Sequence, residues 1–341
     1  MNREEQFERR VAGLLGEASA QIRVVKAGER LKLGLPRRGE GLARTFSLYQ
    51  PQTAKAVALK WGLRQACSLG GRFVFPKMQG VVEKSCPDWI ADPNSVGILF
   101  GNPSHKSLRA AVCYQGKGGW EVAKLIEDSG SGQLENERAA LEAAAARGVA
   151  VPRVEGFERL EGCVLLRMEF LESEGVDIDV EEMIPLASKM LSEKKMLVSE
   201  WKPWTDLTVF FEPSVARDLG QLEVSSALSH GDFAKWNVRK SKDGFFLIDW
   251  EYGSDKSLSG LDLVHLFSQE AELVEGKSPA DTVSEVLKGL GQTKASAYLS
   301  ESGWNGQERE LMMISYAHTT WRGQQDQRSL LNEVSKRCKN E

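Results

Sequence analysis

The chain has 341 residues, 41% hydrophobic and 27% charged, which is long enough for two lobes and typical of a globular protein. Its formal net charge of −4 shows no basic excess and argues against a nucleic-acid partner, and no run of about 18 apolar residues predicts a membrane span. The polar start lacks the apolar core of a secretory signal, and the five scattered cysteines form no Cys-x-x-Cys pair. Both features favour a cytoplasmic protein with reduced thiols, without a disulfide framework or zinc site.

Residues 1–90 carry weak signals, and we interpret them as an N-terminal extension. The patterns predict a helix over 4–16, strands over 22–26 and 31–35, and a helix over 54–67. Basic residues gather between positions 23 and 38. They are expected to form a solvated face, with an anionic partner or substrate tail as the alternative. A protein partner could also bind this extension.

From about residue 95 the pattern becomes rich in strands. We expect strands over 96–101, 108–114 and 120–125, the first two joined by the loop 101–107. A helix over 134–147 is rich in Ala and Glu and ends before Gly148. Further strands are expected from residue 151 and over 164–171.

The second half of the chain has mainly helical patterns. Helices are expected over 183–197 and 215–222, from residue 261, and near 280–290, 307–320 and 328–337. Between them, the segment 230–251 stands out because its polar side chains have a fixed spacing.

Asp232 and Asn237 are five positions apart, and Asp249 directly follows the apolar run 246–248, which predicts a strand. Phosphoryl transfer from ATP needs one carboxylate to orient and accept the proton of an attacking hydroxyl. It also needs an amide and a second carboxylate to hold Mg²⁺ on the phosphates. Protein kinases use the same spacing of Asp and Asn, with a metal-binding Asp further along the chain.

His230-Gly231-Asp232 with Asn237, followed by Ile248-Asp249-Trp250-Glu251, resembles the aminoglycoside phosphotransferase/choline kinase family. The resemblance covers residues 91–270 well and residues 1–90 hardly at all. It implies an α+β, bilobal protein-kinase-like fold. After the extension 1–90, a β-rich N-lobe would span 91–170, and a mainly helical C-lobe with the catalytic and metal-binding loops would span 171–341.

The resemblance implies nucleotide-binding residues in the N-lobe. Lys124 resembles the strand lysine that holds the α and β phosphates of ATP, and Glu137 on the following helix is its expected partner. Glu135 and Glu142 compete for that pairing, and any of the three could instead be an exposed helix carboxylate.

Two further segments are placed by position in the resemblance. The loop 101–107, with Ser104 in it, would lie over the phosphates, although it lacks the protein-kinase glycine pattern. Backbone groups from Glu169 to Leu171 would meet the adenine edge, or would simply belong to a buried strand.

In the C-lobe the resemblance assigns Asp232 to the hydroxyl proton and Asn237 and Asp249 to Mg²⁺. Lys235 could contact a phosphate in the transition state or lie exposed. His230 and Asp262 are expected to be structural, His230 as a brace of the loop and Asp262 as a partner of backbone or catalytic-loop groups.

The predicted function is transfer of the γ-phosphate of Mg²⁺·ATP, with GTP as an alternative, to a hydroxyl of a small molecule. The resemblance favours a sugar, an amino sugar or a related metabolite. Several carboxylates follow Asp249 and could receive a cationic amino sugar, or could form a solvated helix face. They are Glu251, Asp255, Glu270, Glu272 and Glu275.

Two other functions remain open at the level of sequence. A protein kinase is disfavoured because no Asp-Phe-Gly or Ala-Pro-Glu element occurs, and because the segment after Asp249 leaves little room for an activation loop. A catalytically weak nucleotide-binding or scaffold protein on a kinase fold would keep the same residues. Measured turnover with any acceptor separates that reading from an enzyme.

Overall fold

The computed structural model describes residues 2–27, 31–49, 51, 54–78, 85–102, 106–172, 178–242 and 244–339. The chain divides into two compact units. Unit 1 comprises Met1–Arg138 and Pro152–Glu172, and unit 2 comprises Ala139–Val151 and Ser173–Glu341. No helix among the described residues is long and apolar enough to cross a membrane.

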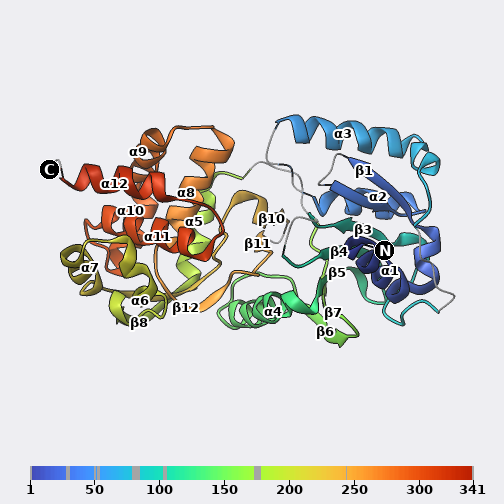
Figure 1. The fold of residues 1–341 in the computed structure, drawn as a ribbon, viewed down its shortest axis with the longest axis horizontal. Coiled ribbons are helices and arrows are strands. Elements are labelled where there is room, and N and C mark those ends of the chain that lie inside the picture. Colours follow the sequence, from blue (N-terminus) through green and yellow to red (C-terminus); the bar gives the residue numbers. More distant parts are fainter. Residues whose placement is uncertain are drawn as a thin grey trace. The chain divides into compact units, whose positions relative to one another are not determined.

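Unit 1 is built on a seven-stranded antiparallel sheet with the order β1-β2-β3-β4-β5-β7-β6 (Figure 1). Its strands are β1 (Arg23–Ala27), β2 (Leu31–Leu35), β3 (Gly97–Phe100), β4 (Arg109–Gly116), β5 (Gly119–Glu127), β6 (Val154–Leu160) and β7 (Cys163–Glu169). Because β2 pairs with β3, two strands from the first 90 residues continue the sheet formed by later strands. The sheet therefore has no break at the boundary drawn from the sequence.

Helices cover this sheet and complete its core. They are α1 (Arg3–Leu15), α2 (Gly39–Ser47), α3 (Ala54–Ser68) and α4 (Ser131–Ala146), the last of which ends in unit 2. A capping box at Asn2 and Glu5 starts α1 by satisfying free backbone N–H groups. At Gly97 a Cβ atom would lie 1.7 Å from Thr45 Oγ1, so only glycine lets β3 approach α2 this closely.

Unit 2 is mainly helical. Its helices are α5 (Val180–Met190), α6 (Trp204–Leu207), α7 (Pro213–Gly220), α8 (Leu261–Gln269), α9 (Pro279–Leu290), α10 (Thr293–Ser302), α11 (Glu308–Arg322) and α12 (Arg328–Lys339). A three-stranded sheet has the order β12-β9-β8, from β8 (Leu191–Leu197), β9 (Glu223–Ser229) and β12 (Ser254–Leu258). The strands β10 (Val238–Ser241) and β11 (Gly244–Leu247) form a hairpin.

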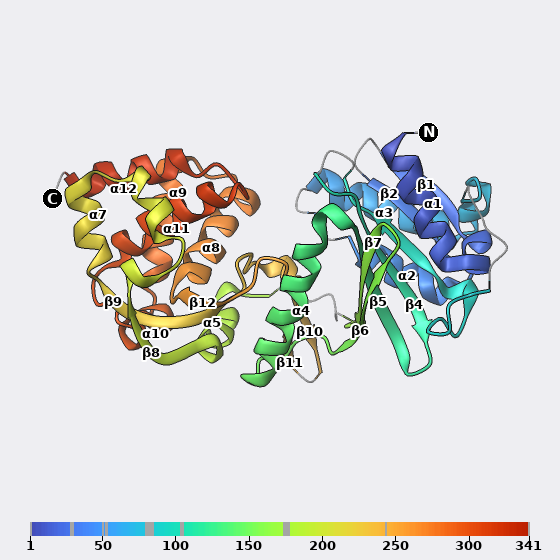
Figure 2. The same cartoon turned by 60° about the horizontal axis from the view of Figure 1, so that its bottom comes forward.

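The predicted division into a β-rich N-terminal part and a mainly helical C-terminal part is confirmed. The helix expected over 183–197 is wrong after Met190, because residues 191–197 form β8 and pair with β9 (Figure 2). That strand is stabilised by a partner more than 25 residues further along the chain, which a local helical pattern does not contain. The sequence also did not predict α2 and α10.

Candidate active site

The loop 230–237 connects β9 to β10. A single turn of 3₁₀ helix, Lys235–Asn237, ends the loop and leads into the β10–β11 hairpin. The hairpin brings the chain back, so that Ile248 N donates to Asn237 O at 2.9 Å. Asp249 therefore follows directly after a backbone segment that is paired with Asn237.

The Asp232 carboxylate is held at both oxygens. His265 Nε2 lies 2.9 Å from Oδ1, and Asn237 Nδ2 donates to Oδ2 at 2.9 Å and to the backbone oxygen of Asp232 at 2.8 Å. Burial raises the pKa of Asp232, but the hydrogen bond and charge of His265, with His230 and Asn237, outweigh it and lower the pKa overall. Asp232 is thus an oriented carboxylate that stays ionised.

Asp262 on α8 fixes the start of the loop. Its Oδ1 accepts from Ser229 Oγ at 2.9 Å and from Gly231 N at 3.0 Å, and its Oδ2 accepts from His230 N at 2.8 Å. The residue is only 7% exposed, so these three donors have no ready replacement in water. The structural role predicted for Asp262 is confirmed.

His230 also has the bracing role that the sequence predicts. Its buried ring accepts from Asp232 N at Nδ1 (3.3 Å), which leaves Nε2 as the donor to Ile248 O at 2.9 Å. The ring packs against Trp250 with the ring centres 4.6 Å apart. His230 therefore ties the loop to the segment that carries Asp249.

Asp249 has an unusual backbone conformation, with φ at +66°, the only positive φ at a non-glycine among the described residues. Such a conformation costs roughly 1–2 kcal/mol for most residues, and aspartate tolerates it better than most. The next residue, Trp250, is fully buried and donates from Nε1 to Leu247 O at 3.1 Å, which holds the segment in place. Strained backbone of this kind often marks functional positions.

Asn237 and Asp249 supply oxygen ligands that suit Mg²⁺. Both amide hydrogens of Asn237 are donated to Asp232, so Oδ1 is the remaining polar atom of that side chain. No group of three or more His, Cys, Asp or Glu side chains that could hold a metal is present in the described ranges. The donor set fits Mg²⁺, which usually takes one or two protein oxygens and completes its shell with water and phosphate oxygens.

Lys235 is neither isolated nor fully exposed. Its Nζ lies 2.7 Å from Glu270 Oε1, and both side chains are about three-quarters buried. Glu270 begins a single π-helical turn, Glu270–Val274, which extends α8. Such turns frequently occur at functional sites.

In unit 1, Lys124 on β5 lies against Glu137 on α4, with Nζ and Oε1 2.5 Å apart. The Glu137 side chain is 1% exposed, so this ion pair is largely shielded from water. Glu135 pairs instead with Arg159. The geometry therefore places Glu137 opposite Lys124.

The remaining residues predicted to bind the nucleotide are Ser104, Glu169 and Leu171. Ser104 lies outside the described residues. Glu169 ends β7, its N–H donates to Arg153 O at 2.9 Å, and Leu171 follows as a half-buried residue. Contact of Glu169 and Leu171 with adenine stays a prediction.

The sequence did not single out several residues near the loop. His265 contacts Asp232 directly. Gln324, beyond the end of α11, donates from Nε2 to Gly231 O at 3.0 Å, and Arg322 donates from Nη2 to Tyr252 O at 3.1 Å. Arg239 is buried beside Asp249; burial lowers its pKa to about 10, although the charge of Asp249 acts in the opposite direction.

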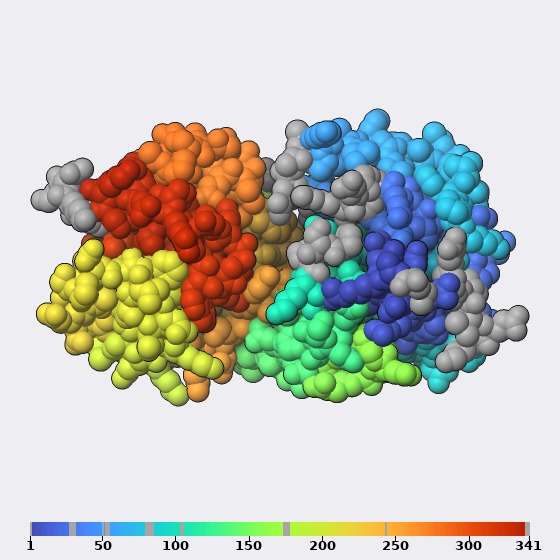
Figure 3. Space-filling view, viewed as in Figure 1, coloured from blue at the N-terminus to red at the C-terminus, as the bar shows by residue number. Residues whose placement is uncertain are grey.

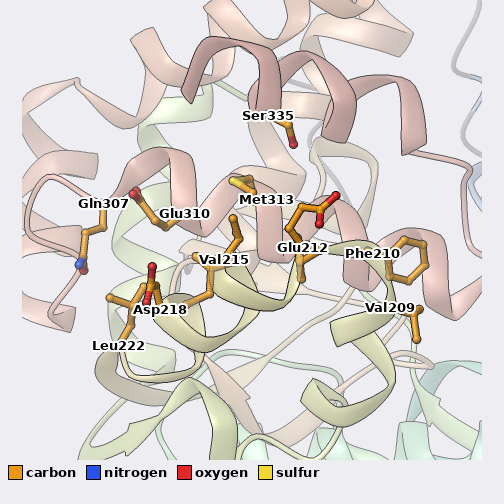
Figure 4. Close-up of a pocket in the computed structure, with 12 residues that line it drawn as sticks. Val209, Phe210, Glu212, Val215, Asp218, Leu222, Gln307, Glu310, Met313 and Ser335 are labelled. Atoms are coloured by element: carbon orange, nitrogen blue, oxygen red, sulfur yellow. The ribbon is translucent and has the colours of Figure 1, made fainter. Parts of the chain in front are cut away.

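Two cavities among the described residues of unit 2 are relevant to the site. The larger, of about 590 Å³, lies among α7, α11 and α12 and is lined by apolar side chains and three carboxylates (Figure 4). No residue of the loop 230–237 lines it. The smaller, of about 350 Å³, does include Lys235 and Glu270 in its lining.

No protein-family model and no curated protein sequence matches the chain. Solved structures with a similar arrangement include a putative fructosamine-3-kinase from Haemophilus somnus. It has 11% identity and a TM-score of 0.45, with 70% of this chain and 90% of that chain covered. A thermostable mutant of aminoglycoside phosphotransferase APH(4)-Ia, in a ternary complex with ADP and hygromycin B, has 11% identity and a TM-score of 0.42, with coverages of 72% and 93%.

A Plasmodium vivax ethanolamine kinase is also similar, with 13% identity, a TM-score of 0.40, and 73% of this chain and 82% of that chain covered. Kinases of small molecules are thus among the structures that this chain resembles. At these identities and TM-scores, support for a function has to come from the chain's own residues.

Proposed function

We propose that the chain is a Mg²⁺·ATP-dependent phosphotransferase that moves the γ-phosphoryl group to a hydroxyl of a small molecule. The observation that carries this proposal is the Asp232 carboxylate, held at both oxygens by His265 and Asn237. Asp249 follows Ile248, whose N–H donates to Asn237 O. Phosphoryl transfer depends mainly on positioning and on neutralisation of phosphate charge, and this set of groups is suited to both.

Each residue then has a role in the reaction. Asp232 orients the acceptor hydroxyl and receives its proton as the new oxygen–phosphorus bond forms, while the bond from the γ phosphorus to the β–γ bridging oxygen breaks and ADP leaves. Asn237 and Asp249 hold Mg²⁺, which neutralises charge on the β and γ phosphates when it is bound. Lys124, fixed by Glu137, is proposed to hold the α and β phosphates.

The proposed acceptor is a sugar or amino sugar, with an amino sugar favoured. The cavity of about 350 Å³ that includes Lys235 is lined by more carboxylates than cations. The carboxylates are Asp179, Glu181, Glu270, Glu275 and Glu285, against the cations Lys235 and Lys288. Such a lining offers hydrogen-bond acceptors to hydroxyl groups and favours a positively charged ligand.

The test combines ligand binding with turnover. Thermal unfolding is measured with ATP, with and without Mg²⁺, for the wild type, Asp249→Asn, Asp232→Asn and the control Asp206→Asn, whose side chain is exposed on α6. ATP at about 100 times its dissociation constant adds roughly 2.7 kcal/mol, which is a shift of a few degrees. ADP release is then measured with panels of amino sugars, neutral sugars and amino alcohols.

The expected pattern differs between the variants. Wild type and Asp206→Asn show a Mg²⁺-dependent shift and turnover, Asp249→Asn loses both, and Asp232→Asn keeps the shift but loses turnover by orders of magnitude. Full turnover in Asp232→Asn, or a wild type that shows no Mg²⁺-dependent shift with ATP or GTP, would reject the proposed function. Turnover with neutral sugars alone would reject only the preference for an amino sugar.

A further inference from the structure

One stretch of unit 1 has no acidic residue. From position 41 to position 82 the sequence has six lysines and arginines and no aspartate or glutamate. The whole chain has 48 acidic residues among 341, a density that would place about six in a stretch of this length. A stretch with basic residues and no acidic ones, in a chain of net charge −4, favours an anionic partner.

The same stretch exposes apolar side chains. Among the described residues, ten large hydrophobic side chains are exposed, and six of them lie between positions 57 and 74. They are Val57, Leu59, Trp61, Leu69, Phe73 and Val74. Trp61 is 65% exposed and Leu69 is 89% exposed. Single exposed hydrophobic residues are normal on a protein surface, so the informative feature is that six of them come from one short segment.

The helix α3 shows how this surface arises. Cys67 is its one buried residue with a described side chain, and Leu63 packs beside it against the core formed by Leu33 and Phe46. The other exposed residues of α3 are apolar or basic, apart from the neutral polar Gln65 and Ser68. Figures 1 and 3 show α3 along the outer edge of unit 1.

We define the α3 surface as the six exposed apolar residues together with the basic residues of the same segment. The basic members are Lys55, Lys60, Arg64, Arg72 and Lys77, of which Lys55, Arg64 and Lys77 are exposed. Arg72 also lies over the Phe73 ring at 4.7 Å, so cationic and aromatic groups are interleaved. Lysine and arginine can lay their apolar stems along apolar surface and keep their charged ends in water, so basic, apolar and aromatic groups together suit the boundary between lipid headgroups and acyl chains.

We propose that the α3 surface binds the surface of an anionic phospholipid membrane. The apolar side chains would enter the boundary between headgroups and acyl chains, while the basic side chains contact lipid phosphates. A second copy of the chain fits less well. A two-fold interface would place the same basic residues against each other without one acidic partner from the α3 surface.

The experiment is co-sedimentation of the full chain with phosphatidylcholine vesicles, with and without about 30% phosphatidylglycerol. The wild type is expected to sediment with the anionic vesicles, to bind the neutral ones far less, and to be released by added salt because salt screens charge. Absence of binding to the anionic vesicles at low salt would overturn the proposal.

Two double variants separate the apolar and cationic contributions. Lys55→Ser with Arg64→Ser is expected to weaken binding roughly 25-fold, at about fivefold for each basic residue removed. Trp61→Ser with Leu69→Ser should weaken binding to anionic vesicles at high salt as well as at low salt. The matched control in unit 2, Lys202→Ser with Val209→Ser, changes an exposed lysine and an 80% exposed valine, and should bind like the wild type.

Equal binding by the α3 variants and the control would overturn the proposal. So would a wild-type dimer in sedimentation velocity that both α3 variants abolish, if the wild type does not bind vesicles, because the surface would then belong to a second copy. All variants change exposed side chains, so unchanged unfolding curves are expected and serve as the folding control.

Discussion

Replacement of Asp262 by asparagine tests the proposed architecture of the loop without any knowledge of the substrate. Asparagine has the same shape, but it can accept hydrogen bonds at only one of its two terminal atoms. Its best orientation keeps Oδ1 toward Ser229 and Gly231, and turns the amide nitrogen toward His230 N. Two donors then face each other in a buried position, because Asp262 is 7% exposed.

The magnitude follows from these three hydrogen bonds. A hydrogen bond to a charged group contributes about 1.5–3 kcal/mol, and a buried donor left without an acceptor costs about 1–3 kcal/mol. Asp262→Asn loses one hydrogen bond completely, and the other two become weaker because their acceptor is no longer charged. We therefore expect the free energy of unfolding of unit 2 to fall by about 2–4 kcal/mol. Asp262→Ala loses all three bonds and should be destabilised by at least as much.

The assay is urea unfolding followed by tryptophan fluorescence and far-UV circular dichroism. Because the chain has two compact units, the two probes must give coincident transitions before one free energy is assigned. Hydrogen exchange at the amides of His230 and Gly231 should be faster in Asp262→Asn. The control Asp255→Asn changes an exposed residue of β12 and should stay within about 0.5 kcal/mol of the wild type. An Asp262→Asn protein as stable as this control, with unchanged exchange, would refute the reasoning.

Three further predictions concern stability and reactivity. Because the pKa of folded Asp232 lies below its usual 3.8, its stabilising contribution is present above that pH and is lost as the pH falls through the lower folded value. The difference in free energy of unfolding between the wild type and Asp232→Asn, measured in urea, should therefore become smaller in that acidic range. A difference that does not change with pH would contradict this. Trp250→Ala should lower the free energy of unfolding by about 3–5 kcal/mol. Trp250→Phe should lower it by less, because Phe fills part of the space although Leu247 O loses its donor. Equal losses for the two variants in urea unfolding would contradict the importance of this packing. Burial raises the pKa of Cys113 to about 11, so Cys113 should react with a thiol reagent at about pH 8 only after unfolding, and rapid labelling of Cys113 in the native protein would disagree.

The sequence predicted most of the helices and strands, because their hydrophobic periodicity is local. Pairings between distant segments were not predictable in the same way. β2 pairs with β3 although more than 60 residues separate Leu33 from its partner Leu99, and β8 is a strand because β9 lies beside it. Such pairings depend on tertiary contacts that override local preference. This is why the first 90 residues were interpreted as an extension although two of their strands join the main sheet.

The candidate site was predictable as far as fixed spacing reaches. Asp232, Asn237 and Asp249 stand close in sequence on one loop and one hairpin. His265 was missed, although a signal for it exists. It lies three positions after Asp262 on α8, and residues at that spacing share one face of a helix. Because Asp262 was expected to form hydrogen bonds with the loop 230–237, His265 could have been expected to face the same loop. Arg322 and Gln324 had no such signal, because the end of α11 and the residues after it are brought to the loop only by the fold.

In the proposed reaction, the contacts of Asp232 limit the catalytic role that this residue can take. A carboxylate with two oxygens has about four acceptor positions, and His265 and Asn237 use one on each oxygen. Both oxygens therefore keep an acceptor position for a hydroxyl group, but the direction of the carboxylate is fixed. A lowered pKa makes Asp232 a weak base, and a weak base is adequate where bond formation lags behind bond cleavage in the transition state. The arrangement is thus better suited to aiming an acceptor hydroxyl than to activating it, and His265 contributes by fixing that aim.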